Sequence, residues 1–282
     1  MTYISPPPLA RRDLSTRRGV FAALSVEPMS AARGTVLLLP GYTKDKEDFL
    51  PLLPLLSEAG YRAFAVDLRG QNETEGGHDA TAYRREELGE DVVALAEALG
   101  ARPHLAGHSM GGQIARGAVL AAPSAFASLT LLSSGPAQVG EERGAQVKLL
   151  TGALTTMTMD QVWPSLQRLR PERASSPGAD ERRARWLRTN RTQLLATGRN
   201  LLDEPDRTAE LAALSGLAVH VLHGDRDDTW APPVLADMAR RLGARHTALA
   251  DTGHSPHVER PQAAARAMAS FWDGVRSTAS PR

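Results

Sequence analysis

The chain has 282 residues, of which 42% are hydrophobic and 23% charged, and its formal net charge is +1. A nearly neutral charge favours neither nucleic acid nor an anionic membrane surface as a partner. The absence of cysteine excludes disulfides, thiolate metal sites and a cysteine nucleophile. The N-terminal residues lack the apolar core of a signal peptide, and no apolar run approaches the roughly 18–20 residues that span a bilayer. We therefore expect a cytoplasmic protein with no membrane span.

Candidate strands and helices alternate along most of the chain. The candidate strands are residues 19–26, 35–40, 61–67, 103–107, 128–134, 218–224 and 245–250. Helical patterns occupy residues 47–59, 81–99, 110–121, 232–242 and 262–274. Several strands are continuously apolar, as expected where both faces of a sheet are covered, so the alternation predicts an α/β fold with a mostly parallel, doubly wound sheet. The first two strands have no helix between them, and we expect them to pair antiparallel with each other at one edge.

The alternation breaks between residues 137 and 210, where only helical patterns are present. The helical pieces are 140–157, 160–169 and 179–202. A loop rich in proline, serine and glycine occupies 170–180. We predict that 137–210 is an all-helical cap inserted into a core domain formed by 1–136 and 211–282, because loops at the carboxyl edge of such sheets commonly cover ligand sites. The alternative is that these helices only extend the core.

The stretch AGHSMGGQ, residues 106–113, joins a predicted strand to a predicted helix. Gly107, Ser109 and Gly111 form the pattern G-x-S-x-G, which makes a sharp, strained turn at such a junction. Larger side chains at the two glycine positions would collide. Ser109 then projects at the start of the helix, where backbone N–H groups point at a developing negative charge. The context predicts a nucleophilic serine, and the alternative is a structural turn residue.

A serine hydroxyl needs a base to become a nucleophile, and the base needs a group that orients it. One later strand ends in a loop with Asp225, Asp227 and Asp228, and the next ends in a loop with His254 and His257. These loops follow parallel strands, as the predicted serine does, and so share one edge of the sheet. The order serine, aspartate, histidine predicts a catalytic triad.

Five stretches resemble the motifs of the α/β-hydrolase fold superfamily: LLLPGY, DLRGQNET, GHSMGG, HGDRDD and GHSPHVERP. The resemblance covers nearly the whole chain and is to the serine-nucleophile branch with a helical cap. It implies that Ser109 is the nucleophile, His254 the general base and Asp227 the acid. It also implies an oxyanion hole formed by the backbone N–H groups of Tyr42 and Met110.

Two stretches depart from the family pattern. Pro40-Gly41 stands where the family often has His-Gly, which stiffens the loop but keeps the N–H of Tyr42. Asn72 and Thr74 replace a glycine and a serine in DLRGQNET. Asparagine tolerates a left-handed backbone better than most residues, and threonine keeps a hydroxyl. Neither departure touches the predicted triad.

Other histidines and aspartates close to the predicted triad in sequence are either alternative catalytic residues or structural ones. His257 is the alternative base, and the other aspartates of the acid's loop are alternative acids. We expect His108 to pack beneath the turn. A metal site at His254 and His257 would need a helix and a third ligand, and Pro256 argues against a helix. We therefore predict no metal.

Four residues are candidates for the substrate pocket: Trp230, Trp163, Met157 and Val258. Trp230 belongs to the loop of the predicted acid, which faces the site. Trp163 and Met157 belong to the predicted cap. We expect the arginine run within 182–191 to be a solvated helix face, and binding of an acidic substrate is the alternative.

Together these features predict a cofactor-independent serine hydrolase that acts on a small-molecule acyl substrate, either a carboxylic ester, a lactone or a thioester. C–C bond hydrolysis, and acyl transfer or cyclisation in a biosynthetic pathway, would use the same triad. Family members that cleave epoxides or carbon–halogen bonds typically carry aspartate at the nucleophile position, so Ser109 argues against both. A ligand-binding protein without turnover is the alternative of another class, although such members often lose a triad residue.

Overall fold

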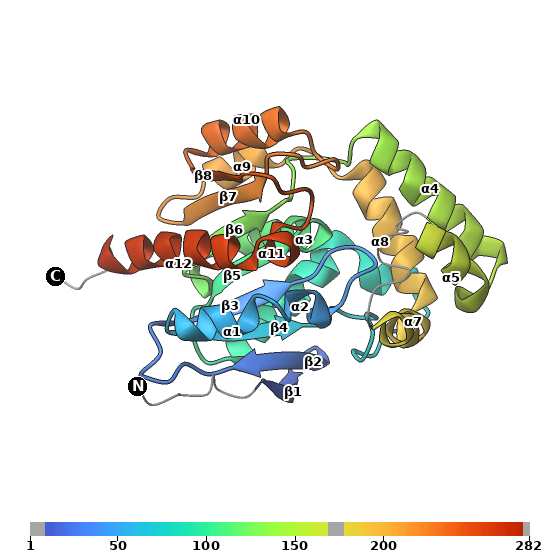
Figure 1. Ribbon diagram of the computed structural model, residues 1–282, viewed down its shortest axis with the longest axis horizontal. Coiled ribbons are helices and arrows are strands. Elements are labelled where there is room, and N and C mark those ends of the chain that lie inside the picture. Colours follow the sequence, from blue (N-terminus) through green and yellow to red (C-terminus); the bar gives the residue numbers. More distant parts are fainter. Residues whose placement is uncertain (1–8, 169–177, 279–282) are drawn as a thin grey trace.

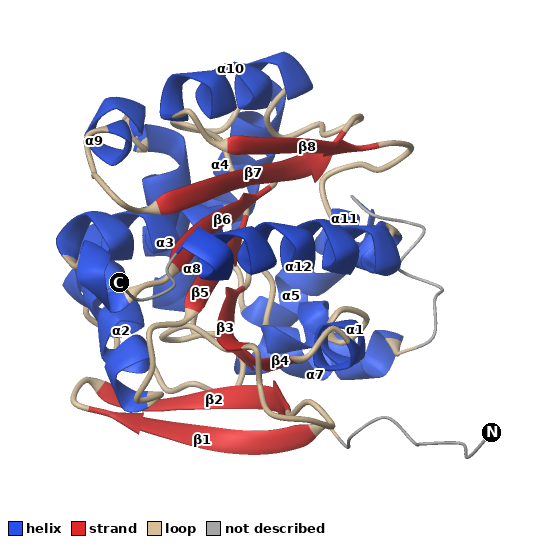
Figure 2. Ribbon diagram, turned by 90° about the vertical axis from the view of Figure 1, so that its left-hand side faces the viewer, coloured by secondary structure: helices blue, strands red, loops and turns tan. Residues whose placement is uncertain are grey.

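The computed structural model describes residues 9–168 and 178–278, and one eight-stranded sheet forms its centre (Figure 1, Figure 2). The strands are β1 (Ala10–Thr16), β2 (Gly19–Val26), β3 (Gly34–Leu39), β4 (Tyr61–Val66), β5 (His104–His108), β6 (Ser128–Leu132), β7 (Ala218–Gly224) and β8 (Arg245–Leu249). Their order is β1-β2-β4-β3-β5-β6-β7-β8. The strands from β4 to β8 in this order are parallel, and β1 and β2 are antiparallel to their neighbours. The predicted mostly parallel sheet is therefore confirmed.

The antiparallel edge of the sheet differs from the prediction. The pairing expected between β2 and β3 is wrong, because β2 pairs with β4, with Ala23 opposite Val66. The connection through α1 (Leu53–Glu58) places β4 beside β3 and between β3 and β2. β1 covers the other side of β2, with Ala10 opposite Ser25. Apolar patterning does not reveal β1, because this edge strand, ARRDLST, carries charged side chains that stay exposed.

Helices cover both faces of the sheet (Figure 2). One face carries α2 (Arg85–Ala98), α3 (Met110–Ala121) and α10 (Pro232–Leu242), and the other carries α1 and α12 (Pro261–Thr278). Successive residues of β3 point to opposite faces: Leu37 belongs to the apolar cluster of the first face and Leu38 to that of the second. This is why the central strands are apolar at every position.

Four helices between β6 and β7 lie together at one side of the sheet (Figure 1). They are α4 (Glu141–Thr156), α5 (Met159–Arg168), α7 (Ala179–Arg188) and α8 (Arg191–Asp203). Leu154, Trp186 and Leu194 belong to an apolar cluster that these helices share. Val147 and Leu201 belong instead to the main apolar cluster of the sheet. The helical segment therefore has an outer part with its own core and an inner part continuous with the sheet.

Two ion pairs of the buried Glu204 also join the helical segment to the sheet domain. Glu204, which directly follows α8, lies 2.6 Å from the guanidinium of Arg116 on α3 and 2.6 Å from that of Arg85 on α2. Arg116 is 1% exposed. The short helix α9 (Thr208–Ala212) then leads the chain back to β7.

The structure bears on three further predictions: a helix at 47–59, a loop at 170–180 and the absence of a membrane span. The helix predicted at 47–59 is two pieces, the 3-10 turn η1 (Lys46–Phe49) and α1, because Pro51 lacks the N–H that a continuous helix needs. The loop predicted at 170–180 lies outside the described residues, apart from its last three positions. Among the helices of the described ranges, none has the length and apolar character to cross a membrane.

Candidate active site

Ser109 lies in the turn between β5 and α3, at the carboxyl edge of the sheet. Its backbone has a φ of 54° and a ψ of −120°, which is strained for a residue other than glycine. A Cβ atom on Gly107 would lie 2.2 Å from the carbonyl oxygen of Gly111, and one on Gly111 would lie 2.5 Å from that of Leu39. Only glycine therefore fits at both positions of the G-x-S-x-G pattern.

His254 lies between Ser109 and Asp227. Its Nε2 is 3.0 Å from Ser109 Oγ, and its Nδ1 is 3.0 Å from Asp227 Oδ1. Because a carboxylate only accepts, the Nδ1–H group donates to Asp227, and Nε2 accepts the hydroxyl proton of Ser109. The structure thus brings together, in one hydrogen-bonded chain, three residues that come from loops after β5, β7 and β8.

The carboxylate of Asp227 is buried, and its Oδ1 also accepts the backbone N–H of Thr229 at 2.9 Å. Burial raises the pKa of Asp227, but the hydrogen bonds from His254 and Thr229 outweigh burial and hold this pKa below its ordinary value. The side chain of Asp228 is 69% exposed and accepts instead from Arg143. Of these two aspartates, Asp227 is the one that contacts His254.

Glu259 holds the loop that carries His254. Its carboxylate accepts the N–H of Gly253 at 2.7 Å and that of Ser255 at 3.0 Å, the two residues on either side of the histidine. Glu259 ends α11 (Pro256–Glu259). Pro256 does not prevent a helix here, because proline is tolerated at the first helical position, but α11 begins after His254 and therefore does not carry both histidines. Sequence reasoning did not single out Glu259, and its only signal is its place in GHSPHVERP.

Two backbone N–H groups near Ser109 are available to a ligand. Met110 is the first residue of α3. Tyr42 follows Gly41, whose Cβ, if present, would lie 3.2 Å from the Cβ of Ser109. Among the described residues, none accepts a hydrogen bond from the N–H of Tyr42 or of Met110. Two such donors beside a serine can hold an oxyanion.

The side chain of Tyr42 points away from this donor pair and toward the helical segment. Its hydroxyl donates to the backbone carbonyl of Leu194 on α8 at 3.0 Å. Burial raises the pKa of the Tyr42 hydroxyl, so the hydroxyl is protonated and remains a donor. The loop that carries Tyr42 is thereby tied to α8.

Two further histidines lie beneath the turn. The ring of His108 packs on those of His254 and His257, with centroids 4.9 Å and 4.5 Å away. His108 Nε2 donates to the backbone carbonyl of His254 at 2.8 Å, and His257 Nε2 donates to Asp48 at 3.0 Å. Burial lowers the pKa of both His108 and His257. His257 therefore contacts Asp48, whereas His254 is the histidine that contacts Ser109.

Among the residues that the structure describes, two groups of side chains have ligand atoms close enough for a metal ion, and the atoms of each group lie within 4.8 Å of one another. They are Asp48, His108 and His257, and Asp227, Asp228 and His254. In the first group, Asp48 already accepts from the ammonium of Lys44 at 2.6 Å and from His257, so a metal would compete with both. In the second, a metal at His254 Nδ1 would break the bond to Asp227. We assign neither group to a metal.

A cavity of about 90 Å³ opens at Ser109. Its described lining residues are Gly41, Tyr42, Thr43, Lys44, His108, Ser109, Val139, Arg143, Gln146, Val147, Leu150, Leu166, Leu201, Thr229, His254 and Ser255. A second cavity, of about 350 Å³, shares Thr43, Lys44 and Leu166 with the first. The loop after β3 and helix α5 thus form the boundary between two adjoining cavities.

Two of the four predicted pocket residues, Trp163 and Val258, line the second cavity. Trp230 and Met157 line neither. The ring of Trp230 is buried with its centroid 6.1 Å from that of His254, and its N–H is bonded to backbone carbonyls that precede α4. Met157 packs against the apolar cluster of the helical segment. Neither side chain lines the cavity at Ser109, because Trp230 packs against the segment that precedes α4 and Met157 packs within the helical segment.

A family model described as the alpha/beta hydrolase family matches residues 36–267, and the chain belongs to this family. Among curated proteins, the chain is 35% identical over 138 residues to the dihydrolipoyllysine-residue acetyltransferase component of the acetoin cleaving system of Pseudomonas putida. That match covers 48% of this chain and 35% of the relative, so the chain spans about a third of the relative's length.

Solved structures resemble the whole fold. A hydrolase from Pseudomonas aeruginosa PA01 has a TM-score of 0.76 at 26% sequence identity, with 93% of this chain and 97% of that chain covered. The carboxylesterase CesB (YbfK) from Bacillus subtilis has a TM-score of 0.75 at 18% identity, with 95% and 93% covered. At 18% identity the second likeness concerns the fold alone.

Proposed function

We propose that this chain is a serine hydrolase in which Ser109, His254 and Asp227 act as a catalytic triad. The observation that carries the proposal is the position of the His254 ring, 3.0 Å from both Ser109 Oγ and Asp227 Oδ1 at the edge of a cavity. His254 takes the proton of Ser109 as its oxygen attacks a carbonyl carbon. The buried carboxylate of Asp227 stabilises the imidazolium that forms. The N–H groups of Tyr42 and Met110 hold the oxyanion.

The remaining steps use the same groups. The tetrahedral intermediate collapses, and the leaving group departs with the proton that His254 returns to it. A water molecule then gives its proton to His254 and attacks the acyl group, which releases the acid and restores Ser109. These steps need no cofactor. The small cavity at Ser109 favours a small-molecule carboxylic ester, lactone or thioester as the substrate.

We also propose that residues 137–210 act as a cap over this site. The segment supplies five aliphatic side chains to the cavity wall: Val139, Val147, Leu150, Leu166 and Leu201. It also contains Glu204, the buried partner of Arg116. A deletion that includes Glu204 is therefore expected to destabilise the core as well as open the site, because it leaves a buried guanidinium unpaired.

The test combines a fluorophosphonate probe with a panel of p-nitrophenyl esters. We expect the probe to label Ser109 and at least one short-chain ester to be hydrolysed. Ser109→Ala should abolish labelling and lower kcat by about 10⁶, as loss of a triad nucleophile does in other enzymes. Ser165→Ala, on α5 and outside both cavities, is the control and should change neither. A Ser109→Ala variant that retains a tenth of the activity would exclude the serine mechanism, and binding without turnover would favour a ligand-binding protein.

A further inference from the structure

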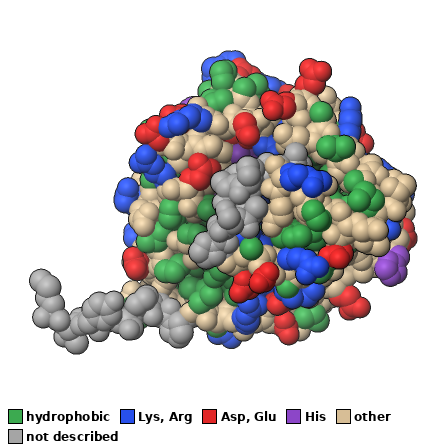
Figure 3. Space-filling model, turned by 45° about the vertical axis from the view of Figure 1, so that its right-hand side comes forward, with side chains coloured by type: hydrophobic (Ala, Val, Ile, Leu, Met, Phe, Trp, Pro, Cys, Tyr) green, Lys and Arg blue, Asp and Glu red, His purple; other side chains and the backbone are tan. Residues whose placement is uncertain are grey.

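The cavity at Ser109 has charge of only one sign among its described lining residues. Lys44 and Arg143 are its charged side chains, and both are cations. Burial holds the pKa of His108 well below its ordinary value, so this lining residue is neutral near pH 7. The second cavity has carboxylates as well as cations in its wall, and the face of the molecule seen in Figure 3 carries acidic and basic side chains interspersed. The positive wall is therefore a local property of the cavity at Ser109.

Arg143, on α4, is held in one orientation by three contacts. Its Nε donates to Thr229 Oγ1 at 3.2 Å, and its two terminal nitrogens donate to Gln146 at 2.8 Å and to Asp228 at 2.9 Å. A guanidinium has five N–H groups, so two of them have no acceptor among the residues that the structure describes. The side chain of Arg143 is 19% exposed and that of Asp228 is 69% exposed. Water therefore screens the counter-ion more than the cation.

Lys44 reaches the cavity from the loop that carries Tyr42. Its Nζ lies 2.6 Å from Asp48, and Asp48 lines the second cavity and not the first. The N–H of Lys44 donates to the carbonyl of Gly41 at 3.3 Å, which fixes the loop. The N-terminus of α3, a helix of 12 residues, adds partial positive charge at Ser109.

We propose that the acyl part of the substrate is short and ends in a carboxylate, which Arg143 and Lys44 bind while Ser109 attacks the carbonyl at the other end. This inference rests on the proposed serine hydrolase function and names its substrate class, the half-esters or half-thioesters of small dicarboxylic acids. A cavity of about 90 Å³ suits such a short chain, since an engineered cavity of about 150 Å³ holds benzene. The planar guanidinium matches a carboxylate, and charged hydrogen bonds are roughly twice as strong as neutral ones.

The test compares two methyl esters of nearly equal shape, methyl hydrogen succinate and methyl levulinate. The first ends in a carboxylate, and the second ends in a methyl ketone with the same number of heavy atoms. We expect kcat/KM to favour the anionic ester by about tenfold to a hundredfold, the effect of hydrogen bonds to a charged group. Arg143→Gln and Lys44→Met should each lower this preference, and Arg143→Gln should lower it by about tenfold or more. The readout is the ratio of kcat/KM for the anionic ester to kcat/KM for the neutral ester. A general loss of activity in either variant lowers both values equally and leaves this ratio unchanged.

The matched control is Lys148→Gln. Lys148 lies on α4, as Arg143 does, but its side chain is exposed and lines neither cavity. Loss of this cation should leave the preference for the anionic ester unchanged. Binding of both esters to Ser109→Ala, measured by calorimetry, provides a second readout that requires no chemistry, and it should show the same preference.

The outcomes separate this inference from the proposed function. Ser109-dependent turnover of both esters with no preference for the anion overturns the substrate class alone. A preference that persists in both Arg143→Gln and Lys44→Met overturns the assignment of the two cations. If neither ester is cleaved and the fluorophosphonate does not label Ser109, the serine hydrolase proposal fails. Binding to Ser109→Ala then still decides whether the cavity selects an anion.

Discussion

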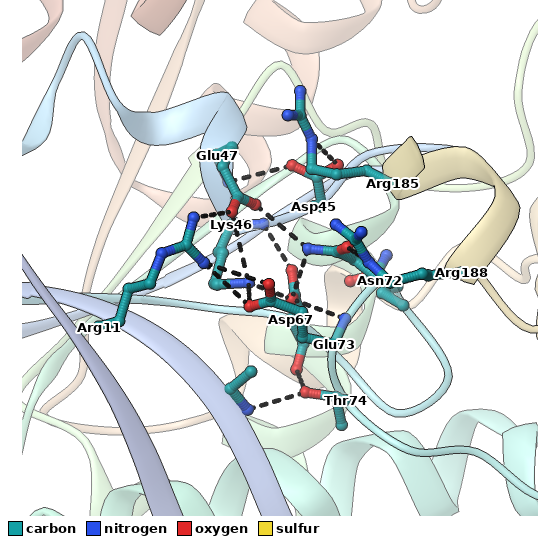
Figure 4. A network of polar contacts seen from close by, with 12 residues as sticks. Arg11, Asp45, Lys46, Glu47, Asp67, Asn72, Glu73, Thr74, Arg185 and Arg188 are labelled. Carbon is teal, nitrogen blue, oxygen red and sulfur yellow. Dashed lines mark hydrogen bonds and ion pairs between the residues drawn. The ribbon is translucent and has the colours of Figure 1, made fainter. Parts of the chain in front are cut away.

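Two clusters of largely buried polar side chains, each with one more accessible member (His254 and Glu73), lie at the carboxyl edge of the same sheet. They are the proposed triad of Ser109, His254 and Asp227, and an ion cluster of Lys46, Asp67 and Glu73 (Figure 4). Asp67 directly follows β4, as Ser109 directly follows β5. Lys46 is 1% exposed and Asp67 is 0% exposed, so these side chains are at least as buried as those of the triad. Burial of polar groups at the functional edge therefore does not distinguish the two clusters.

The difference between the clusters is whether they face a cavity. In the ion cluster, Lys46 Nζ lies 2.6 Å from the carboxylates of both Asp67 and Glu73, and Asp67 also accepts the N–H of Lys46 at 2.8 Å. Lys46 and Asp67 line neither of the two cavities beside the helical segment. Ser109 and His254 both line one. A polar cluster can react only if a ligand can reach it, so access to a cavity matters more than buried charge.

The largest expected effect is on catalysis by the triad. Asp227→Asn keeps the shape of the side chain but removes the charge that orients and stabilises the His254 ring, and we expect kcat to fall by about 10⁴. Asp228→Asn is the matched control, because that side chain contacts Arg143 and is mostly exposed, so we expect it to retain most of the activity. The measurement is kcat with a p-nitrophenyl ester together with urea unfolding. The reverse ranking of the two variants would show that the acid has been misassigned.

A substitution in the ion cluster should lower stability more than it lowers activity. Lys46→Met leaves the carboxylates of Asp67 and Glu73 without their buried partner, which should lower the free energy of unfolding by about 3–5 kcal/mol. The activity of each folded molecule should change far less than in Asp227→Asn. Lys148→Met removes an exposed lysine and is the control for stability. Normal stability combined with a catalytic loss as large as that of Asp227→Asn would contradict the division into a reactive and a structural cluster.

A smaller, pH-dependent effect is expected beside the ion cluster, at Asp45. Burial raises the pKa of Asp45 to about 7, and the neighbouring carboxylates of Glu47 and Asp67 add to this although Arg185 opposes it. Because the pKa is higher in the folded state, the contribution of Asp45 to stability is present below its ordinary pKa of 3.8 and is lost as the pH rises through about 7. Wild type should therefore lose stability relative to Asp45→Asn between about pH 4 and pH 7.

Urea unfolding at several pH values across that window measures this loss. Asp160→Asn serves as the control, since Asp160 is 60% exposed in its pair with Arg183. Parallel stability curves for wild type and Asp45→Asn would contradict the raised pKa.

The smallest effect is expected where the ion cluster meets the helical segment. Arg188 donates to Asn72 at 2.9 Å, but its side chain is exposed. Removing such a contact costs about 0–1 kcal/mol, so Arg188→Gln should barely move the urea midpoint, much like Arg183→Gln at another exposed position of α7. A loss comparable to that of Lys46→Met would mean that the ion cluster extends energetically into α7.

Much of this molecule is predictable from its sequence because local patterns carry the information. Continuously apolar runs mark the strands that are covered on both faces, and β3 to β6 follow them closely. The glycines around Ser109 predict the tight turn, because a Cβ at either position would collide with backbone whatever the rest of the fold does. The charged edge strand β1 and the partner of β2 were missed, since pairing at an edge depends on which strand the topology brings alongside.

The sequence by itself thus determined the class of fold, most of its strands and helices, and the residue types gathered at the carboxyl edge of the sheet. Only the tertiary structure decided which side chains meet there. Asp227 rather than Asp228 contacts His254, and Trp230 packs behind that ring instead of lining the cavity. The pairing of Lys46 with Asp67 and the positive wall formed by Lys44 and Arg143 also join distant parts of the chain. The reason is physical: strand and turn patterns are set by neighbours in sequence, whereas the direction of a loop side chain is set by the packing of elements that approach it from elsewhere.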